Sequence, residues 1–342
     1  MKPSESKMLQ GFIGFFGAVY DMTAKYTLAI IVPVMNETNN IRPLTERVAS
    51  VMATEGVKNW EITFVDDGST DTTLEKILAL HLEGFPVGYL SLSRNFGHQR
   101  ALEAGLTHAD ADVVITMDGD LQHPPEEMTA MLAAWREGAE IVHMVPEKAI
   151  RQETEPFYRF YKLISDNGYV SVGSDFRLMS RRVVNLINQI PEQRKVIRAL
   201  STSLGFEQRI LHYQQPHRLH GSSTYGMVQR INMAINLVFN YTTFPLKLVF
   251  YAGLIIAPIS FCFGVGHIIT KLIFGNQVTP GFTDIIVWLL FLSGSILLAI
   301  GIIGKYLENI LVQVVRRPSY VVKDVLVAKQ KKERRNELQD QD

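Results

Sequence analysis

Cysteine is almost absent from the chain, which contains a single one, Cys262, among its 342 residues. A lone cysteine cannot form a disulfide within the chain, and it cannot build a zinc site from several thiolates. Cys262 also lies inside an apolar run, where we expect it to act as a small buried or lipid-facing side chain. Disulfide-stabilised folds and cysteine zinc folds are therefore excluded.

Two glycine-rich phosphate-binding motifs are missing as well. No G-x-G-x-x-G follows a predicted strand, and no G-x-x-x-x-G-K-[ST] occurs at any position. Such loops cradle the phosphates of dinucleotides and of nucleoside triphosphates with backbone N–H groups. A dinucleotide-dependent oxidoreductase and a P-loop enzyme are therefore disfavoured.

Neither sign of charge is in excess over the whole chain, which has 34 basic and 34 acidic residues. Basic residues nevertheless gather near the C-terminus, beside only Asp324 and Glu333: Arg316, Arg317, Lys323, Lys329, Lys331, Lys332, Arg334 and Arg335. We expect the segment 308–342 to be a basic cytoplasmic tail close to anionic lipid headgroups. A solvated, partly disordered end is the alternative.

Charge is nearly absent from two long apolar runs, Phe244–Ile269 and Ile285–Gly304. Each is longer than the roughly 18 residues that mark a candidate membrane span. A helix that is apolar all round belongs in lipid, which disfavours the alternative of two buried core helices. Basic residues precede the first run and follow the second, so the positive-inside rule places both chain ends in the cytoplasm. We predict transmembrane helices at 244–270 and 285–307, joined by a non-cytoplasmic loop at 271–284.

Other segments are candidates for the membrane surface. The N-terminal extension, 1–26, holds an apolar stretch from Leu9 to Tyr20 that is too short to span a bilayer. It lacks a basic region followed by a small-residue cleavage site, so we do not interpret it as a signal peptide. We predict an interfacial helix at 231–243. Residues 157–164 have similar spacing, and an ordinary half-buried helix explains them equally well.

Residues 27–230 alternate short β-rich runs with amphipathic stretches, which is typical of a mostly parallel α/β sheet. The pattern predicts strands at Leu28–Val34, Glu61–Val65, Gly88–Leu92 and Val113–Met117, and helices at Ile41–Thr54, Thr72–Leu80 and Arg100–His108. Polar clusters follow these strands. Open α/β sheets bind ligands at the carboxyl ends of their strands, so we expect the functional site there.

The cluster after the fourth predicted strand contains Asp118 and Asp120. Residues two apart in extended backbone point the same way, so the two carboxylates can share one hard divalent cation. Mg²⁺ or Mn²⁺ prefers oxygen ligands and completes its shell with substrate phosphates, so this pair could hold a nucleotide diphosphate. A single D-x-D also occurs by chance in many turns, but the strand before it and Gln122, His123 and Pro124 after it strengthen the metal interpretation.

Two more clusters follow the second and third strands. Asp66 and Asp67 could accept hydrogen bonds from a nucleobase or a ribose, while a plain turn with a helix cap is the alternative. Arg94 belongs to the next cluster, with Asn95, Gly97 and His98. These side chains suit phosphate or sugar hydroxyl groups, although the pattern is unspecific.

Taken together, the motifs resemble the glycosyltransferase family 2 polyprenyl phosphate sugar synthases, a group with dolichyl phosphate mannose synthases and bacterial GtrB-type and ArnC-type enzymes. The resemblance runs from about Leu28 to Leu326. It rests on Val32-Pro33-Val34-Met35-Asn36-Glu37, Val65-Asp66-Asp67-Gly68-Ser69, Ser93-Arg94-Asn95-Phe96-Gly97, Met117-Asp118-Gly119-Asp120-Leu121-Gln122-His123-Pro124, Asp175-Phe176-Arg177-Leu178-Met179, and Arg218 with Gly221-Ser222-Ser223-Thr224-Tyr225. Two apolar spans and Arg317-Pro318-Ser319-Tyr320 follow in the expected order.

The resemblance implies an α/β domain of the GT-A type at 27–230, followed by two C-terminal transmembrane helices. It implies donor contacts from Pro33, Glu37, Asp66, Asp67, Arg94 and Asp118, metal contacts from Asp118, Asp120 and Gln122, and acceptor-phosphate contacts from Arg177, Arg218, Ser222 and Tyr225. Asp118, Asp120, Asp175 and Arg177 are the implied catalytic group. Met35, Ser174 and Thr224 depart from the usual family residues, and Thr224 leaves the acceptor contacts least defined.

A phosphate acceptor is already anionic at neutral pH, so the reaction needs no strong general base. Catalysis would come from alignment of the reacting atoms and from a metal and arginines that screen negative charge. Asp175 could orient Arg177 or a sugar hydroxyl, and a purely structural partnership with that arginine is the alternative.

The sequence thus predicts a metal-dependent, inverting transfer of sugar from a nucleotide diphosphate, UDP rather than GDP, to polyprenyl phosphate. Mg²⁺ or Mn²⁺ is the expected cofactor. We expect a multi-pass protein of the inner membrane with a cytoplasmic catalytic domain. We expect no nucleic acid partner, and the sequence leaves a homo-oligomer open. One alternative is a processive polysaccharide synthase, although no Q-x-x-R-W motif occurs. The other is a non-catalytic membrane protein that binds a sugar nucleotide and assists glycan assembly.

Overall fold

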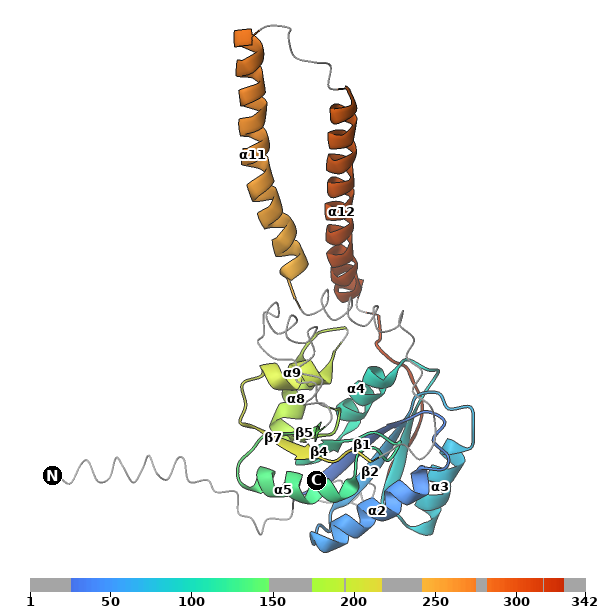
Figure 1. Cartoon of the computed structure of the whole chain (residues 1–342). Coiled ribbons are helices and arrows are strands. Elements are labelled where there is room, and N and C mark those ends of the chain that lie inside the picture. Colours follow the sequence, from blue (N-terminus) through green and yellow to red (C-terminus); the bar gives the residue numbers. More distant parts are fainter. Residues whose placement is uncertain are drawn as a thin grey trace, which may run out of the picture. The chain divides into compact units, whose positions relative to one another are not determined.

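The computed structural model describes residues 26–147, 174–193, 195–216, 242–274, 282–315 and 317–328. Two compact units divide the chain. The first comprises Met1–Glu155, Val170–Gly221 and Pro318–Asp342, and the second comprises Pro156–Tyr169 and Ser222–Arg317. The first unit therefore contains segments that precede and segments that follow Ser222–Arg317 in the sequence (Figure 1).

Four parallel strands form the centre of the sheet in the first unit, with β1 and β2 paired from Leu28↔Trp60 to Val34↔Asp66. They are β1 (Leu28–Val34), β2 (Trp60–Asp66), β3 (Val87–Leu92) and β4 (Val113–Thr116). The helices α2 (Ile41–Thr54), α3 (Thr73–Glu83) and α4 (His98–His108) connect them. The seven elements predicted from the sequence all occur, with ends that differ by at most a few residues.

Successive side chains of β1 point to opposite faces of the sheet, and all seven of its residues are buried. Leu28, Ile30 and Val32 pack in one core cluster with α2, α3 and α5 (Met128–Arg136). Ala29 and Ile31 pack in a second cluster with α4, α8 (Arg181–Gln189) and α9 (Ile197–Ser203). The sheet therefore lies between two layers of helices, which explains the continuous apolar strand sequences (Figure 1).

Beyond β4 the sheet becomes mixed, which differs from the mostly parallel sheet that we predicted. Its order is β7-β5-β6-β4-β1-β2-β3-β8. The strands β5 (Ile141–Pro146) and β7 (Gln208–Tyr213) are parallel to each other, whereas β6 (Arg177–Ser180) is antiparallel to both β4 and β5. A short 3-10 helix, η1 (Pro125–Glu127), precedes α5. The strand β6 matters for the site because its first residue, Arg177, is buried in the protein interior.

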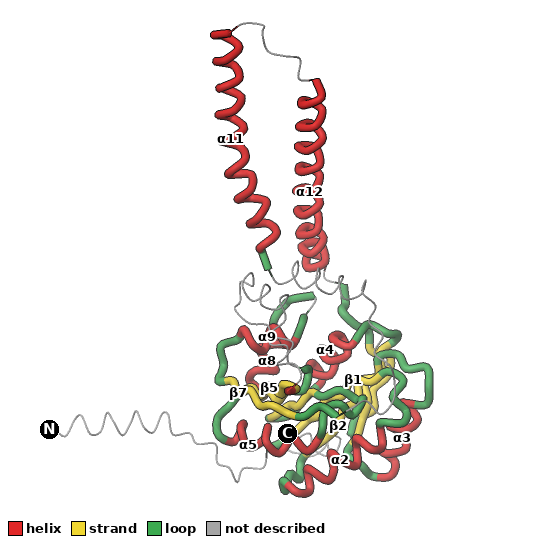
Figure 2. Tube along the Cα trace, viewed as in Figure 1, coloured by secondary structure: helices red, strands yellow, loops and turns green. Residues whose placement is uncertain are grey.

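The last strand, β8 (Val322–Leu326), pairs antiparallel with β3 at the edge of the sheet. Figure 2 shows the strands of the sheet in yellow. A Cβ at Gly88 of β3 would collide with the Leu326 carbonyl oxygen, so glycine permits this close approach. The Tyr89 hydroxyl donates a 2.7 Å hydrogen bond to Asp324. Our prediction of a tail at 308–342 did not anticipate this strand, because its pairing partner lies far away in the sequence.

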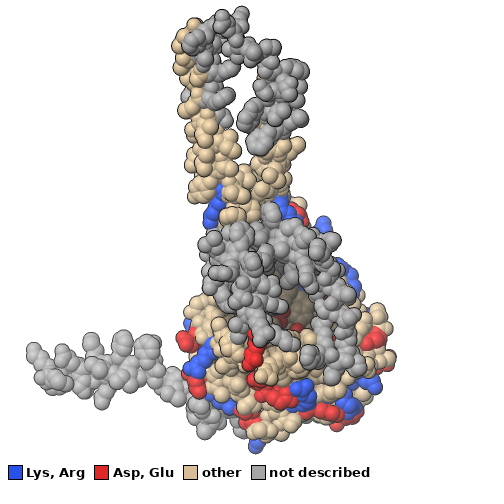
Figure 3. Space-filling view, in the orientation of Figure 1, with Lys and Arg blue, Asp and Glu red and all other residues tan. Residues whose placement is uncertain are grey.

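Two long helices account for the described part of the second unit: α11 (Phe244–Phe274, 31 residues) and α12 (Phe282–Val315, 34 residues). Apolar side chains are widely exposed along them, and the described part of their surface carries little charge (Figure 3). Within α12, Leu292–Val315 is long and apolar enough to cross a membrane, whereas Phe244–Ile256 of α11 is a shorter apolar stretch. Both helices extend past the predicted spans at 244–270 and 285–307.

Several predicted features lie outside the described residues. They are most of the N-terminal extension, the 157–164 segment, almost all of the interfacial segment 231–243, the centre of the 271–284 loop and the C-terminal end of the basic tail.

Candidate functional site

Polar loops meet at one edge of the sheet, where the parallel strands β1, β2, β3 and β4 end. They are Met35–Asn40 after β1, Asp67–Thr72 after β2, the loop ending at Gly97 after β3, and the turn Asp118–Pro124 near the end of β4. Parallel alignment brings these four loops together, as expected for a ligand site in an open α/β sheet.

The Asp66 and Asp67 carboxylates are buried and bind loops within the chain. Asp66 accepts hydrogen bonds from the Ser69 N–H (2.9 Å) and the Ser91 hydroxyl (3.0 Å). Asp67 accepts from the backbone N–H groups of Phe96 (2.7 Å) and Gly97 (2.8 Å), and so fixes the loop after β3. These contacts match the turn alternative from the sequence. Each carboxylate oxygen has more than one lone pair and can accept a further hydrogen bond from the sugar donor. The predicted contacts of Asp66 and Asp67 with the donor stay predictions.

The loops after β1 and β2 are also bonded to each other. Asn36, whose φ is +58°, accepts a 2.8 Å hydrogen bond from the Thr70 N–H. The Glu37 N–H donates to the Thr73 hydroxyl across 3.0 Å. This hydrogen bond holds Glu37, a predicted donor-binding residue, at the edge of the sheet where the parallel strands end. Pro33 lies within the buried strand β1.

Arg94 is exposed on the loop after β3, and its guanidinium carbon lies 4.1 Å from the centre of the Phe96 ring. The same guanidinium donates a 3.0 Å hydrogen bond to the Asn95 carbonyl. Asp67 holds this loop through hydrogen bonds, so the polar cluster after β2 and the polar cluster after β3 are bonded to each other. The contact of Arg94 with a phosphate or a sugar hydroxyl of the donor remains a prediction.

The Asp118–Gly119–Asp120 turn is fixed mainly by His123. The Asp118 N–H donates a 2.8 Å hydrogen bond to His123 Nδ1, and Leu121 adopts a φ of +62°. The Gln122 N–H donates to Asp120 Oδ1 across 3.1 Å. A side chain at Gly119 would contact Val34 at 2.8 Å, so the turn packs tightly against β1. The sequence marked His123 only as part of the motif that favours a metal site and did not predict that it fixes the turn.

His123 is buried, and its ring stacks on Phe176 with 5.1 Å between the ring centres. Burial lowers the pKa of His123 and keeps the ring neutral at physiological pH. Because Nδ1 accepts a hydrogen bond, the proton lies on Nε2, which is 3.5 Å from Asp118 Oδ2.

The turn offers the oxygen ligands that a hard divalent cation requires. Asp118 Oδ1 is buried and has no hydrogen-bond partner in the described part of the chain. Asp120 and Gln122 follow it in the same turn, where Gln122 Oε1 accepts a 3.3 Å hydrogen bond from Gln215. No group of three His, Cys, Asp or Glu side chains that could hold a metal occurs among the described residues. The oxygen atoms of Asp118, Asp120 and Gln122 are of the type that Mg²⁺ prefers, and Mg²⁺ commonly completes its coordination with substrate oxygens.

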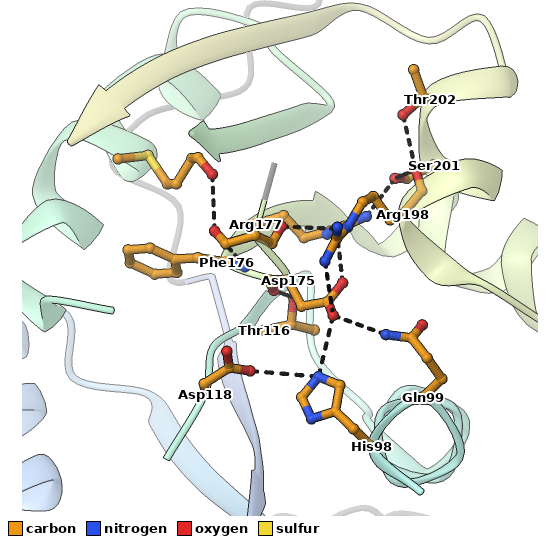
Figure 4. Close-up of polar contacts among 12 residues, drawn as sticks. His98, Gln99, Thr116, Asp118, Asp175, Phe176, Arg177, Arg198, Ser201 and Thr202 are labelled. Carbon is orange, nitrogen blue, oxygen red and sulfur yellow. Dashed lines mark hydrogen bonds and ion pairs between the residues drawn. The ribbon is translucent and has the colours of Figure 1, made fainter. Parts of the chain in front are cut away.

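Asp175 is the centre of a second group of polar side chains beside this turn (Figure 4). Its carboxylate accepts hydrogen bonds from Gln99 (2.8 Å), Arg177 (3.0 Å) and His98 (3.2 Å), and it lies 3.4 Å from Arg198. Burial alone would raise the pKa of Asp175, but the His98 hydrogen bond and the two arginine charges hold it well below its usual range. Asp175 is therefore a stable anion that holds several cations in place.

His98 connects the two groups. Its Nε2 lies 3.2 Å from Asp175 Oδ2 and 3.5 Å from Asp118 Oδ1. Burial would lower the pKa of His98, but the hydrogen bond to Asp175 and the Asp118 charge raise it. Sequence reasoning placed His98 in an unspecific cluster and missed Gln99 and Arg198. A glycine followed by a histidine at a helix start was the available signal for His98, whereas Arg198 on α9 had none.

Arg177, which was predicted to contact the acceptor phosphate, is buried in the protein interior. Its side chain is 1% exposed, and it donates to the Ser201 hydroxyl (2.8 Å) and the Ser174 carbonyl (3.1 Å) in addition to Asp175. Burial lowers its pKa to about 10, which leaves it charged at neutral pH. The other residues predicted to contact the acceptor phosphate, Arg218, Ser222 and Tyr225, lie outside the described residues.

A family model and two relatives of similar length show the family of this chain. Residues 29–199 match the family described as Glycosyl transferase family 2. The chain is 35% identical over 302 residues to the SfII prophage-derived bactoprenol glucosyl transferase of Shigella flexneri, covering 86% of this chain and 97% of that protein. It is 34% identical over 306 residues to the prophage bactoprenol glucosyl transferase homolog of Escherichia coli, with 87% and 99% covered. A solved structure of glucosyl-3-phosphoglycerate synthase from Mycobacterium tuberculosis is 17% identical, covers 65% of this chain and 81% of that chain, and gives a TM-score of 0.44.

Proposed function

The chain belongs to glycosyl transferase family 2, and from this premise we propose that it transfers a sugar from a UDP-sugar to polyprenyl phosphate. The family makes it a glycosyltransferase. The acceptor class is supported by relatives that are named bactoprenol glucosyl transferases and are matched over nearly their whole length.

The observation that best supports this function is the turn after β4. It presents the Asp118 and Asp120 carboxylates at the strand-end edge, and one buried Asp118 oxygen has no hydrogen-bond partner within the described residues. Asp118, Asp120 and Gln122 would hold Mg²⁺ or Mn²⁺, which supplies Lewis-acid stabilisation of the departing diphosphate when bound. Both carboxylates are present, which disfavours a non-catalytic sugar-nucleotide-binding protein.

The proposed reaction is a single displacement that inverts the anomeric centre. An acceptor phosphate oxygen forms the new bond to the anomeric carbon while the bond from that carbon to the donor diphosphate breaks. No proton must be removed from the acceptor, because its oxygen is already anionic. The surroundings of Asp175 support this mechanism, since a carboxylate with a strongly lowered pKa and several hydrogen bonds is a poor base. Its role is to position the cations around it.

Membrane insertion through a helical hairpin is part of the proposal. The strands β7 and β8 belong to one sheet, so they lie on the same side of any membrane. The chain between them must cross a membrane an even number of times or not at all. If Leu292–Val315 of α12 spans it, α11 supplies a second crossing, since 31 helical residues at about 1.5 Å each exceed a bilayer core of about 30 Å.

Cysteine labelling in intact cells tests this topology on a background that lacks Cys262. A membrane-impermeant reagent should modify a cysteine placed at Asn276 and should spare one placed at Glu337. The reverse pattern would refute the proposed orientation.

A panel of labelled nucleotide sugars tests the function itself. Purified protein in detergent, with undecaprenyl phosphate and Mn²⁺, should form a labelled lipid from at least one UDP-sugar. A long labelled polymer would instead favour a processive synthase, and the absence of any labelled lipid across the panel would oppose the proposal.

A further inference from the structure

The buried polar atoms that lack hydrogen bonds are concentrated in one place. In the part of the chain that the structure describes, they are Gln99 Oε1, Asp118 Oδ1, Arg177 Nε and Arg198 Nε. All four residues belong to the cluster around Asp175 and His98 (Figure 4). Buried polar groups in native proteins nearly always form hydrogen bonds, so four buried atoms without one in a single cluster point to a ligand or ordered water at this position.

The two arginines of this cluster differ sharply in exposure. The Arg177 side chain is 1% exposed and bonded to Ser201, Ser174 and Asp175. The Arg198 side chain is 31% exposed, and its terminal nitrogen lies 3.4 Å from Asp175 Oδ2. A single carboxylate thus adjoins two guanidinium groups, of which only the Arg198 group is open to a ligand.

Arg198 is also held at a defined position relative to the proposed metal site. Asp175 Oδ2 contacts both Arg198 and His98, and His98 contacts Asp118. In this series of contacts, Asp175 and His98 lie between the Arg198 cation and the Asp118 carboxylate. A displacement reaction needs this separation, because the acceptor phosphate must approach the anomeric carbon from the side opposite the diphosphate.

We propose that Arg198 contacts the phosphate of the polyprenyl phosphate acceptor, and that Arg177 is a positioning residue beneath it. A guanidinium group matches a phosphate with a planar fork of N–H donors, which a lysine ammonium cannot reproduce. Arg177 acts through Asp175, whose charge it balances from the interior. This inference rests on the proposed function and revises the predicted role of Arg177.

The experiment compares full-length wild-type protein with Arg198→Ala, Arg198→Lys and Arg182→Ala. Arg182 is an exposed arginine of the same unit that pairs with Glu140 and lies outside the cluster, so it controls for the loss of one surface charge. Transfer kinetics are measured against undecaprenyl phosphate. Equilibrium binding is measured separately for undecaprenyl phosphate and uncharged undecaprenol, and calorimetry reports the binding of UDP with Mn²⁺.

Arg198→Ala should lower kcat/KM for undecaprenyl phosphate by about 30-fold or more, as for a lost charge-assisted hydrogen bond of about 2 kcal/mol. The variant should lose the preference for the phosphate lipid over the alcohol and keep its affinity for UDP. Arg198→Lys should fall between it and the wild type, because it keeps the charge without the fork, and Arg182→Ala should match the wild type.

The inference is overturned if Arg198→Ala keeps both normal lipid kinetics and the phosphate preference. It is also overturned if UDP affinity collapses while the lipid dependence stays normal, because Arg198 then serves the donor. Failure of the proposed function is a separate result, in which the wild type transfers no sugar; the lipid-binding comparison still decides the role of Arg198.

Discussion

The backbone N–H of Asp118 donates a 2.8 Å hydrogen bond to Nδ1 of the buried His123, so an imidazole from the same turn fixes the proposed metal ligand. His123 in turn stacks on Phe176, which lies between Asp175 and Arg177 in the chain. The proposed metal turn and the cation cluster therefore share one aromatic contact as well as His98.

His123→Phe should weaken activation by the metal while leaving the fold intact. Phenylalanine can keep the stack on Phe176, but it offers no acceptor to the Asp118 N–H. Groups that orient metal ligands typically change metal affinity by about 10- to 100-fold when removed. A Mn²⁺ titration of transfer activity should show a shift of at least about 10-fold in the half-activating concentration. An unchanged titration curve would show that His123 only fills space.

Asp120→Asn should abolish metal-dependent transfer without unfolding the protein. The asparagine oxygen can still accept the hydrogen bond from the Gln122 N–H, so the turn keeps its internal contact. The amide lacks the negative charge that a Mg²⁺ or Mn²⁺ ligand supplies. Turnover close to that of the wild type at saturating Mn²⁺ would refute the metal assignment, provided that thermal unfolding of the two proteins is similar.

Gly68→Ala should destabilise the protein more than Gly84→Ala. Both glycines have positive φ, +78° and +101°, so both variants carry conformational strain of about 1–2 kcal/mol. At Gly68 the new Cβ would also lie 2.7 Å from backbone atoms of Arg94 and Asn95, whereas nothing lies within 4 Å at Gly84. Thermal unfolding in detergent compares the variants. Equal losses would contradict the close contact between the loops after β2 and β3.

His143 should make the folded protein less stable as the pH falls from about 6.5 to about 4. Burial, and then the Arg177 charge, lowers the pKa of His143 to about 4. The unfolded chain binds a proton near pH 6.5, where the folded protein does not, so acidification favours unfolding by on the order of 3 kcal/mol. His143→Gln should flatten the unfolding profile in this range. If His143→Gln loses stability with falling pH as steeply as the wild type, other titrating groups cause the loss of stability.

The central sheet was predictable because each of its strands is a short apolar run that ends in turn residues, as Leu28–Val34 shows. The strand β8 was not, because Lys323 and Asp324 interrupt its apolar pattern and its position depends on pairing with distant β3. The strand β6 begins with a buried charge, Arg177, which no local pattern marks as an interior residue.

The same distinction applies to the site. Asp118 and Asp120 were recognisable because both stand in one local motif after a strand. Arg198 was not, because its relation to Asp175 arises only when the short helix α9 packs near the start of β6. Contacts between distant segments, rather than local sequence, build the half of the site that we assign to the acceptor.

The most direct test of the proposed function is the mass of the lipid product. Purified wild-type protein is incubated with Mn²⁺, the active UDP-sugar and an equal mixture of undecaprenyl phosphate and undecaprenol. We expect the phosphate lipid alone to gain the mass of a single sugar residue, and we expect no gain in the Asp120→Asn sample. Glycosylation of the alcohol, addition of a sugar phosphate to the phosphate lipid, or an unchanged phosphate lipid would contradict transfer to the polyprenyl phosphate oxygen.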